Sequence, residues 1–334
     1  MAWQNSLKVQ KIPVPPGSDH LPPPHGQGLL PTHEFTMGLI AAKGLGKTTT
    51  AINFIMMNRD YFHRILIISP SIRSDVKWKF LMKQELLVEN KPLKDWCNRE
   101  RMKAEEDKIV QNNPVGNFIG SILDKKFSKI IPPEDFIDEC DPYEFMKIME
   151  ENRKIVTLLD EQDQLKTLAD RILVILDDQV GSDFFVGPVK KLFVGFNTRH
   201  RHYSASVLMM AQAYKEVPKT IRTNFTCVLV YRTGNQKELE VIYEEFQMGL
   251  NYKDWLRLYD HATSDEHGFM FIDLYCKDKR LSMRKGFDVA LAYLELRDKD
   301  RDEESTVLPS KKRKLDDKGE SSASTDARVS PKRA

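Results

Sequence analysis

Apolar residues along the chain gather into short runs, separated by stretches in which apolar and polar positions follow a helical spacing. Five short, strongly apolar runs predict buried strands. These runs cover residues 35–40, 64–69, 171–176, 204–211 and 225–231. The helical spacing predicts helices at 48–57, 72–90 and 236–247. Strands that alternate with helices predict an α/β fold, with a mainly parallel sheet covered by helices on both faces.

Residues 91–170 interrupt this alternation between the second and third predicted strands. The stretch is charged and mostly helical, and prolines break it. The breaks fall at Pro92, Pro114, Pro132, Pro133 and Pro142. We interpret it as a helical insertion or lid, and its last part, residues 145–170, predicts one long amphipathic helix.

The two ends of the chain differ from the part between them. Residues 1–33 hold seven of the 17 prolines and show almost no periodicity, which predicts a disordered Pro-rich arm. Runs at 269–275 and 281–287 predict a hairpin that closes the folded domain, which would span residues 34–296. Residues 297–334 are poor in apolar residues and rich in charge and serine, which predicts a disordered tail.

Composition narrows the class of protein. A chain of 334 residues that is 41% hydrophobic suits one large domain, and no apolar run approaches the roughly 18 residues of a membrane span. No secretory signal is visible, so we expect an intracellular protein with no membrane partner. The four cysteines contain no C-x-x-C pair, which argues against a zinc site or a disulfide framework.

The net charge of +2 belongs to the tail, because residues 297–334 hold 11 Lys and Arg against 9 Asp and Glu. The rest of the chain is therefore neutral overall. A neutral body binds nucleic acid only through a local patch, and the basic segments 73–83 and 215–222 are the candidates.

A glycine-rich motif follows the first predicted strand and precedes the first predicted helix. It matches the phosphate-binding loop G-x-x-x-x-G-K-[ST], with alanine at the first position. The motif is Ala41-Ala42-Lys43-Gly44-Leu45-Gly46-Lys47-Thr48-Thr49. Glycines let backbone N–H groups converge on phosphates, and the helix adds the positive end of its dipole. Lys47 would reach the β- and γ-phosphates, and the Thr48 hydroxyl would bind Mg²⁺. Since no Asn-Lys-x-Asp motif for reading guanine is present, the expected nucleotide is ATP.

Polar residues at the ends of two later strands supply the second half of this site. Asp177 and Asp178 follow the third predicted strand, and the carboxyl ends of parallel strands share one edge of a sheet. Asp177 would hold Mg²⁺ directly or through water, and Asp178 would polarise the attacking water. Gln212, at the end of the fourth predicted strand, is a candidate sensor of the γ-phosphate. Arg199 and Arg222 flank that strand and are candidates for a finger that stabilises transferred phosphate, in the same or a neighbouring subunit.

Together these segments resemble the virion DNA-packaging ATPases of the poxvirus type, within the FtsK–HerA superfamily of DNA-pumping motors. Relatives of this kind occur in large DNA viruses, virophages and Polinton transposons. The resemblance spans residues 35–290, and its most specific part is the succession Arg-His, strand, Gln, Ile-Arg-Thr-Asn. The matching segments are Leu39–Thr49, Ile172–Asp178, Asn197–His200, Gln212, Pro218–Asn224, Gly268–Asp273 and Arg284–Asp288.

The resemblance implies an additional-strand P-loop ATPase that forms a homo-oligomeric ring and drives double-stranded DNA into a capsid, with a capsid or portal protein as partner. The site residues that carry over are Lys47, Thr48, Asp177, Asp178 and Gln212. Arg199 and Arg222 both remain candidates for the arginine finger. The sequence departs from the family's pattern at Ala41 and at Asp178, where many relatives have Glu. A shorter acid shifts the base, so slow hydrolysis is one expectation.

A compact basic cluster in the tail, Lys311-Lys312-Arg313-Lys314, has the pattern of a nuclear localisation signal. It predicts a nuclear import receptor as partner and the host nucleus as location, with the virion as a second location. The alternatives are a nonspecific DNA-binding tail and plain solubilising charge.

Other functions stay open on the sequence alone. A RecA-like or helicase-like DNA ATPase would share the site, although no helicase motif set is present. A nucleotide-dependent switch or scaffold with little hydrolysis would share it too. A small-molecule kinase fits the P-loop but not the segment Ile221–Asn224.

Overall fold

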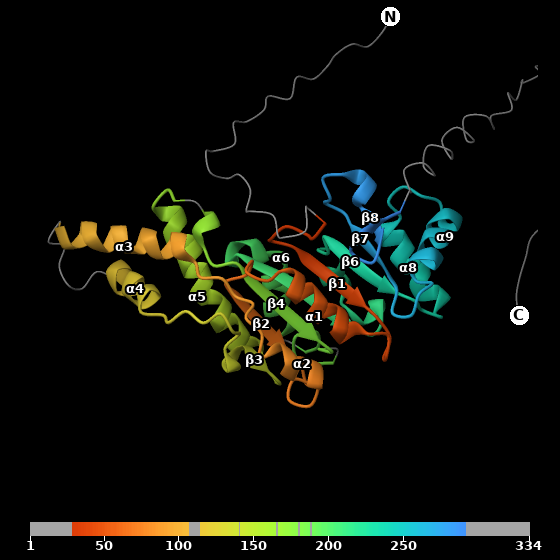
Figure 1. Ribbon diagram of the computed structural model, residues 1–334, viewed down its shortest axis with the longest axis horizontal. Coiled ribbons are helices and arrows are strands. Elements are labelled where there is room, and N and C mark those ends of the chain that lie inside the picture. Colours follow the sequence, from red (N-terminus) through yellow and green to blue (C-terminus); the bar gives the residue numbers. More distant parts are fainter. Residues whose placement is uncertain are drawn as a thin grey trace, which may run out of the picture.

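The computed structural model of the chain describes residues 29–106, 114–139, 141–164, 166–179, 181–187 and 189–291. Within these residues one sheet of nine strands runs through the molecule (Figure 1). The strands are β1 Thr36–Ile40, β2 Arg64–Ile68, β3 Phe136–Ile137, β4 Ile172–Asp177, β5 Ala205–Ala211, β6 Cys227–Tyr231, β7 Phe269–Asp273, β8 Met283–Lys285 and β9 Val289–Ala290. All five residues of β1 are buried, as a central parallel strand requires.

The strand order is β3-β2-β4-β5-β1-β6-β7-β8-β9. The first six of these strands are mutually parallel, and β7, β8 and β9 extend the sheet in antiparallel fashion. Strand β5 therefore lies between the P-loop strand β1 and the acidic strand β4. An extra strand at this place defines the additional-strand class, so the predicted fold class is confirmed. The edge strands β3 and β9 have only two residues each.

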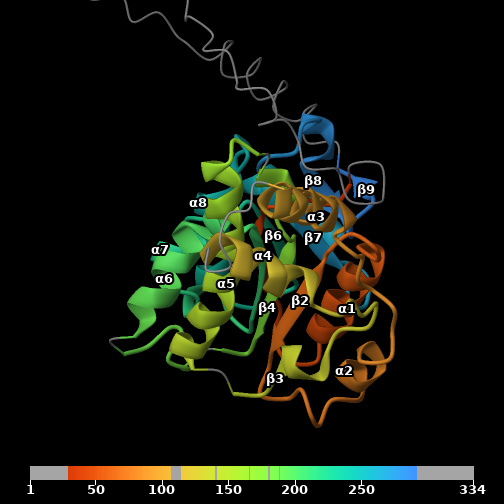
Figure 2. The ribbon, with the colours of Figure 1, turned by 90° about the vertical axis from the view of Figure 1, so that its left-hand side faces the viewer.

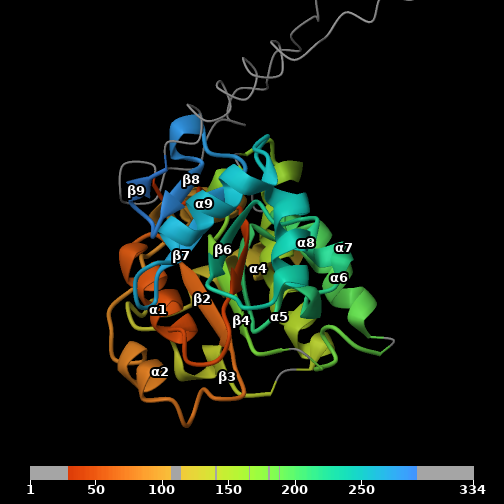
Figure 3. The ribbon, with the colours of Figure 1, turned by 90° about the vertical axis from the view of Figure 1, so that its right-hand side faces the viewer.

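Helices cover both faces of the sheet. Figures 2 and 3 show α1 and α2 on one side of the strands and α6, α7 and α8 on the other. The helices are α1 Lys47–Met57, α2 Val76–Leu81, α3 Lys91–Glu106, α4 Pro114–Leu123, α5 Pro142–Glu161, α6 Lys190–Thr198, α7 Lys219–Arg222, α8 Gln236–Phe246 and α9 Tyr252–Ala262. One core cluster joins α1 and α2 to the sheet, and a second joins α5 to α9 to its other face. The two-sided cover predicted from the sequence is thus confirmed.

The insertion does more than cover the sheet. Its helices α3 and α4 project away from the strands (Figure 1) and pack against α5 through a separate apolar cluster that includes Trp96, Ile119 and Leu159. The same insertion also supplies the edge strand β3, which pairs in parallel with β2. It is therefore tied into the main sheet.

Two predicted helices have the wrong bounds. Residues 72–90 form only the short helix α2, because Leu86, Leu87 and Val88 donate their backbone N–H groups to carbonyls of Lys129 and Phe62. The helix predicted at 145–170 begins at Pro142 and ends at Glu161. Proline has no backbone N–H, and the first residue of a helix does not need one. Pro142 therefore starts this helix, at a position where the sequence predicts a break.

The amino edge of the parallel strands is closed by side-chain hydrogen bonds. The buried ring of His33 lies with Nδ1 2.6 Å from Ser206 Oγ and Nε2 3.2 Å from Ser204 Oγ. His63, which directly precedes β2, accepts a 2.8 Å hydrogen bond at its Nδ1 from the backbone N–H of Arg171. Burial lowers the pKa of His33 well below its usual value and the pKa of His63 to about 3. Both rings are therefore neutral at physiological pH.

Candidate nucleotide-binding site

The P-loop lies at the carboxyl edge of the sheet, between β1 and α1. Gly44 and Gly46 adopt φ values of +88° and +94°, which glycine reaches without steric cost. Gly46 caps α1, so Lys47 is the first residue of the helix, and the first N–H groups of a helix have no partner within it. Ala41, the departure from the motif, is buried and continues the strand by donating its N–H to the Ala211 carbonyl at 3.1 Å.

A pocket of about 510 Å³ opens above this loop. The segments Ala42–Gly44 and Gly46–Thr49 line it, as do Asp178 and Gln212. Leu45 instead packs on the core beneath α1. The structure thus places nine of the twelve predicted P-loop and strand-end positions around one cavity, and the other three, Ala41, Leu45 and Asp177, do not line it.

The two acids meet the P-loop lysine. Lys47 Nζ donates a hydrogen bond to Asp178 Oδ1 and lies 3.7 Å from Asp177 Oδ1. The Gln212 amide nitrogen lies 3.4 Å from Asp178 Oδ1, so the ends of β1, β4 and β5 converge. Asp178 has a φ of +48°, a conformation that aspartate tolerates better than most side chains. This backbone position gives a physical reason for aspartate at the second acidic site.

Asp177 is almost completely buried, at 3% exposure. Its Oδ2 accepts a 2.8 Å hydrogen bond from Ser69, but its Oδ1 has no hydrogen-bond partner among the described residues. Burial raises the pKa of Asp177, and the Lys47 ammonium opposes that shift. An unpaired buried carboxylate oxygen is a cost unless a ligand satisfies it.

The oxygen donors at this place suit a hard divalent cation. The unpaired Asp177 Oδ1 and the hydroxyl of Thr48, which lines the pocket, fit Mg²⁺. When bound, Mg²⁺ would offset the negative charge of the phosphates.

Neither candidate arginine lies in the pocket. Arg199 precedes β5 and so lies at the amino edge of the sheet, where its Nε donates to the Gly195 carbonyl at 3.2 Å. Strand β5 separates the two edges by about 20 Å at the usual rise per residue. Arg222 is buried, its guanidinium 4.5 Å from the centre of the Tyr214 ring and 3.4 Å from Glu245. Arg222 therefore packs the core in this chain.

Sequence reasoning missed four residues at the site. Ser69 orients Asp177, and its position at the end of β2 could have revealed it by the same edge rule. Asp75 and Lys77 reach the pocket from the start of α2. His267 also lines the pocket and packs close to Gly46. No sequence signal pointed to His267, because its place depends on β7 pairing antiparallel with β6.

The basic segments proposed for DNA binding are only partly available. Lys77, Lys79 and Lys83 are exposed along and after α2, whereas Arg73 pairs with Asp138 at 2.7 Å. In the second segment Lys215 and Lys219 are exposed and Arg222 is not. Residues 311–314 lie outside the described residues. No helix in the part of the chain that the structure describes is long and apolar enough to cross a membrane.

Comparison with known proteins finds a family model that matches part of the chain. Residues 118–269 match the family model of the poxvirus A32 protein. Over these residues the chain is similar to the poxvirus A32 protein, and we call them the A32 segment. This A32 segment covers somewhat less than half of the 334 residues and includes β4 to β6, Asp177, Asp178 and Gln212, while the P-loop precedes it. No curated protein matches the chain.

Solved structures give distant likenesses. The genome packaging NTPase B204 from Sulfolobus turreted icosahedral virus 2, in complex with AMP, aligns at 10% identity and a TM-score of 0.39, over 72% of this chain and 92% of that one. The pCW3 conjugation coupling protein TcpA aligns at 10% identity and a TM-score of 0.37, over 62% and 51%. EssC (ATPases 2 and 3) from Geobacillus thermodenitrificans aligns at 12% identity and 0.36, over 59% and 32%.

Proposed function

We propose that the chain is an ATP-hydrolysing motor that translocates double-stranded DNA and packages a viral or virus-like genome into a capsid. One observation carries the enzymatic part. Lys47 of the P-loop donates a hydrogen bond to Asp178 and lies 3.7 Å from Asp177 Oδ1, a buried oxygen with no hydrogen-bond partner among the described residues. The A32 segment supports the motor part, because the sequence resembles virion DNA-packaging ATPases of that type.

The chain's own residues divide the work at the site. The glycines and the start of α1 would bind the phosphates, and Lys47 would leave Asp178 to reach the β- and γ-phosphates. Asp178, released from Lys47, would accept a proton from the attacking water. Gln212 would hold that water or the γ-phosphate from the neighbouring strand end.

The proposed ring of identical subunits would supply an arginine to this pocket from a neighbouring copy. No arginine lines the pocket among the described residues, and phosphoryl transfer gains from one placed on the γ-phosphate. The exposed Arg199 of a neighbouring copy is a candidate to supply it. Lys and Arg around the ring opening would contact DNA phosphates without reading sequence.

The test is ATP turnover by the purified chain, with and without long duplex DNA, beside a Lys47→Ala variant. We expect turnover that rises with duplex DNA and falls at least a hundredfold in the variant, because the variant loses the charge on the phosphates. A second assay measures displacement of a third-strand oligonucleotide that is bound to an intact duplex. Displacement while the duplex strands stay paired distinguishes translocation from helicase-like strand separation. ATP binding without turnover in either condition would instead support a nucleotide-dependent switch.

Nuclear import of the chain is a separate proposal, supported only by the cluster at residues 311–314. Deleting Lys311 to Lys314 should move a tagged copy to the cytoplasm, and unchanged nuclear staining would contradict it.

A further inference from the structure

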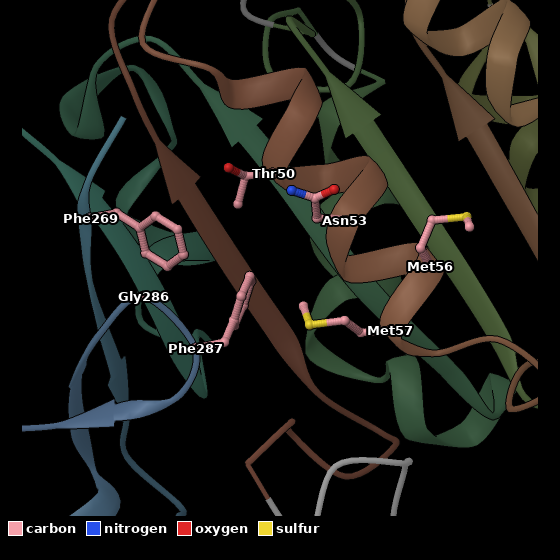
Figure 4. Close-up of a pocket in the computed structure, with 7 residues that line it drawn as sticks. All are labelled: Thr50, Asn53, Met56, Met57, Phe269, Gly286 and Phe287. Carbon is pink, nitrogen blue, oxygen red and sulfur yellow. The ribbon is translucent and has the colours of Figure 1, made fainter. Parts of the chain in front are cut away.

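A groove runs along α1 next to the phosphate pocket (Figure 4). Its volume of about 440 Å³ lies within the range of small-molecule sites. Figure 4 shows α1 side chains, including Asn53 and Met57, on one side and, on the other, Phe269 of β7 and Phe287 of the turn between β8 and β9. Aromatic rings and thioethers thus dominate the groove, and an exposed amide enters from the helix.

The groove and the phosphate pocket share two walls. Thr49 lines the pocket and the next residue, Thr50, lines the groove. On the opposite wall His267 lines the pocket and Phe269 lines the groove. A ligand that fills the pocket therefore has a direct way into the groove.

The strand order sets the direction in which a nucleotide would lie. Asp177 and Asp178 end β4, which lies on the β5 side of β1. The terminal phosphate and its cation must face these acids. The rest of the nucleotide then extends to the other side of β1, toward β6 and β7, where the groove opens.

We propose that this groove binds the adenine base of the nucleotide whose phosphates lie at the P-loop, an inference that rests on the proposed function. Stacking on an aromatic ring suits any base, and Phe287 offers such a surface. The ring is fixed by its neighbours, with centroids 5.1 Å from Phe269, 5.6 Å from Phe271 and 6.0 Å from Phe54.

Asn53 would determine the base specificity of the groove. An asparagine amide pairs its oxygen with the adenine amino group and its nitrogen with N7, whereas guanine presents two acceptors there. The Thr50 hydroxyl does not compete for the base, because it forms a hydrogen bond with the Tyr231 hydroxyl beneath it. Asn53 is therefore a specificity-determining residue for ATP over GTP.

The experiment measures equilibrium binding of ATP, GTP and inorganic tripolyphosphate to the full chain with Mg²⁺. Tripolyphosphate has the phosphates but no base. In Phe287→Ala we expect ATP affinity to fall about tenfold, because a base stack is lost, while tripolyphosphate affinity stays within about twofold. In Asn53→Ala we expect the preference for ATP over GTP to fall from about tenfold to below about threefold. Phe287→Tyr, which keeps the stack, should bind ATP as the unmodified chain does.

Matched controls are Phe127→Ala and Asn98→Ala, since both side chains are exposed in the insertion. Neither control should change any of the three affinities. Asn53 is exposed on a helix, so alanine there leaves folding intact and decides the outcome even if Phe287→Ala unfolds.

Two results would overturn the base site while leaving the proposed function in place. One is an unchanged ATP to GTP preference in Asn53→Ala, and the other is an equal effect of Phe287→Ala on ATP and tripolyphosphate in a folded protein. Tripolyphosphate binding that survives Lys47→Ala would instead overturn the phosphate site, and the proposed function and the base site with it.

Discussion

Two histidines at the amino edge of the parallel strands and two acids at the carboxyl edge differ in how their polar atoms are satisfied. At the amino edge His33 has hydroxyl partners on both ring nitrogens, and His63 accepts a backbone hydrogen bond. At the carboxyl edge Asp177 keeps an unpaired oxygen and Asp178 adopts a positive φ. Both edges belong to the same rigid sheet, so the difference lies in the side chains. The hydrogen bonds of the two histidines contribute stability, and the carboxylate oxygen without a partner beside the P-loop marks the place where a ligand completes the structure.

The largest effect that separates the two edges should come from Asp178→Asn. Asparagine tolerates the same positive φ, so the fold should remain, but it accepts no proton from water. We expect turnover to fall about a thousandfold and ATP affinity to hold or rise, because Lys47 loses its competing carboxylate. Steady-state kinetics and a binding titration measure both. Asp124→Asn, exposed in the insertion, is the control, and weaker ATP binding in Asp178→Asn would contradict the assigned role.

His33→Ala should have the opposite profile. It removes a buried ring and its hydrogen bonds to two serines, so we expect the free energy of unfolding to fall by about 3 kcal/mol. The turnover number of the folded protein should stay within about twofold. Urea denaturation gives the first quantity, with the exposed neighbour Thr32→Ala as control. A loss of turnover without a loss of stability would mean that the two edges are coupled.

The smallest effect, measured at mildly acidic pH, concerns His63. Its folded pKa of about 3 lies below the ordinary value of 6.5, so the unfolded chain takes up a proton first as the pH falls. Stability from this group is complete above pH 6.5 and is lost between pH 6.5 and about 3, by about 1.4 kcal/mol per pH unit. His63→Asn keeps an acceptor that cannot be protonated. Denaturation at several pH values should show a flatter acid limb for the variant, and parallel curves would refute the assignment.

The sequence predicted the carboxyl edge better than the rest of the molecule. The predicted bounds of three strands agree with the structure to within about two residues: β1, which precedes the P-loop, β4, which ends at Asp177, and β5, which Gln212 follows. Strand-end chemistry at a parallel sheet has a local signature, because an apolar run followed by acids or an amide shows in the sequence itself. The convergence of these ends needs only the rule that parallel strands share an edge.

Features that depend on contacts between distant segments were not predictable. The stretch after Leu81 has apolar residues that suit either a helix or an extended chain, and bonding to Lys129 decides for the extended form. His267 reaches the P-loop only because β7 runs antiparallel beside β6. The contacts of Arg222 could not be predicted from the sequence either, because Tyr214 and Glu245 contact it only in the folded core.

The short edge strands have a consequence for how copies of this chain could meet. A sheet with long open edges is a template on which another chain can add a strand. Here β3 and β9 offer two residues each at the ends of the described sheet, so a second copy gains few backbone hydrogen bonds by continuing it. Contacts between neighbours would rely on side chains of helices and loops. Such contacts can loosen and re-form during every turnover, whereas a shared sheet would lock the subunits together permanently.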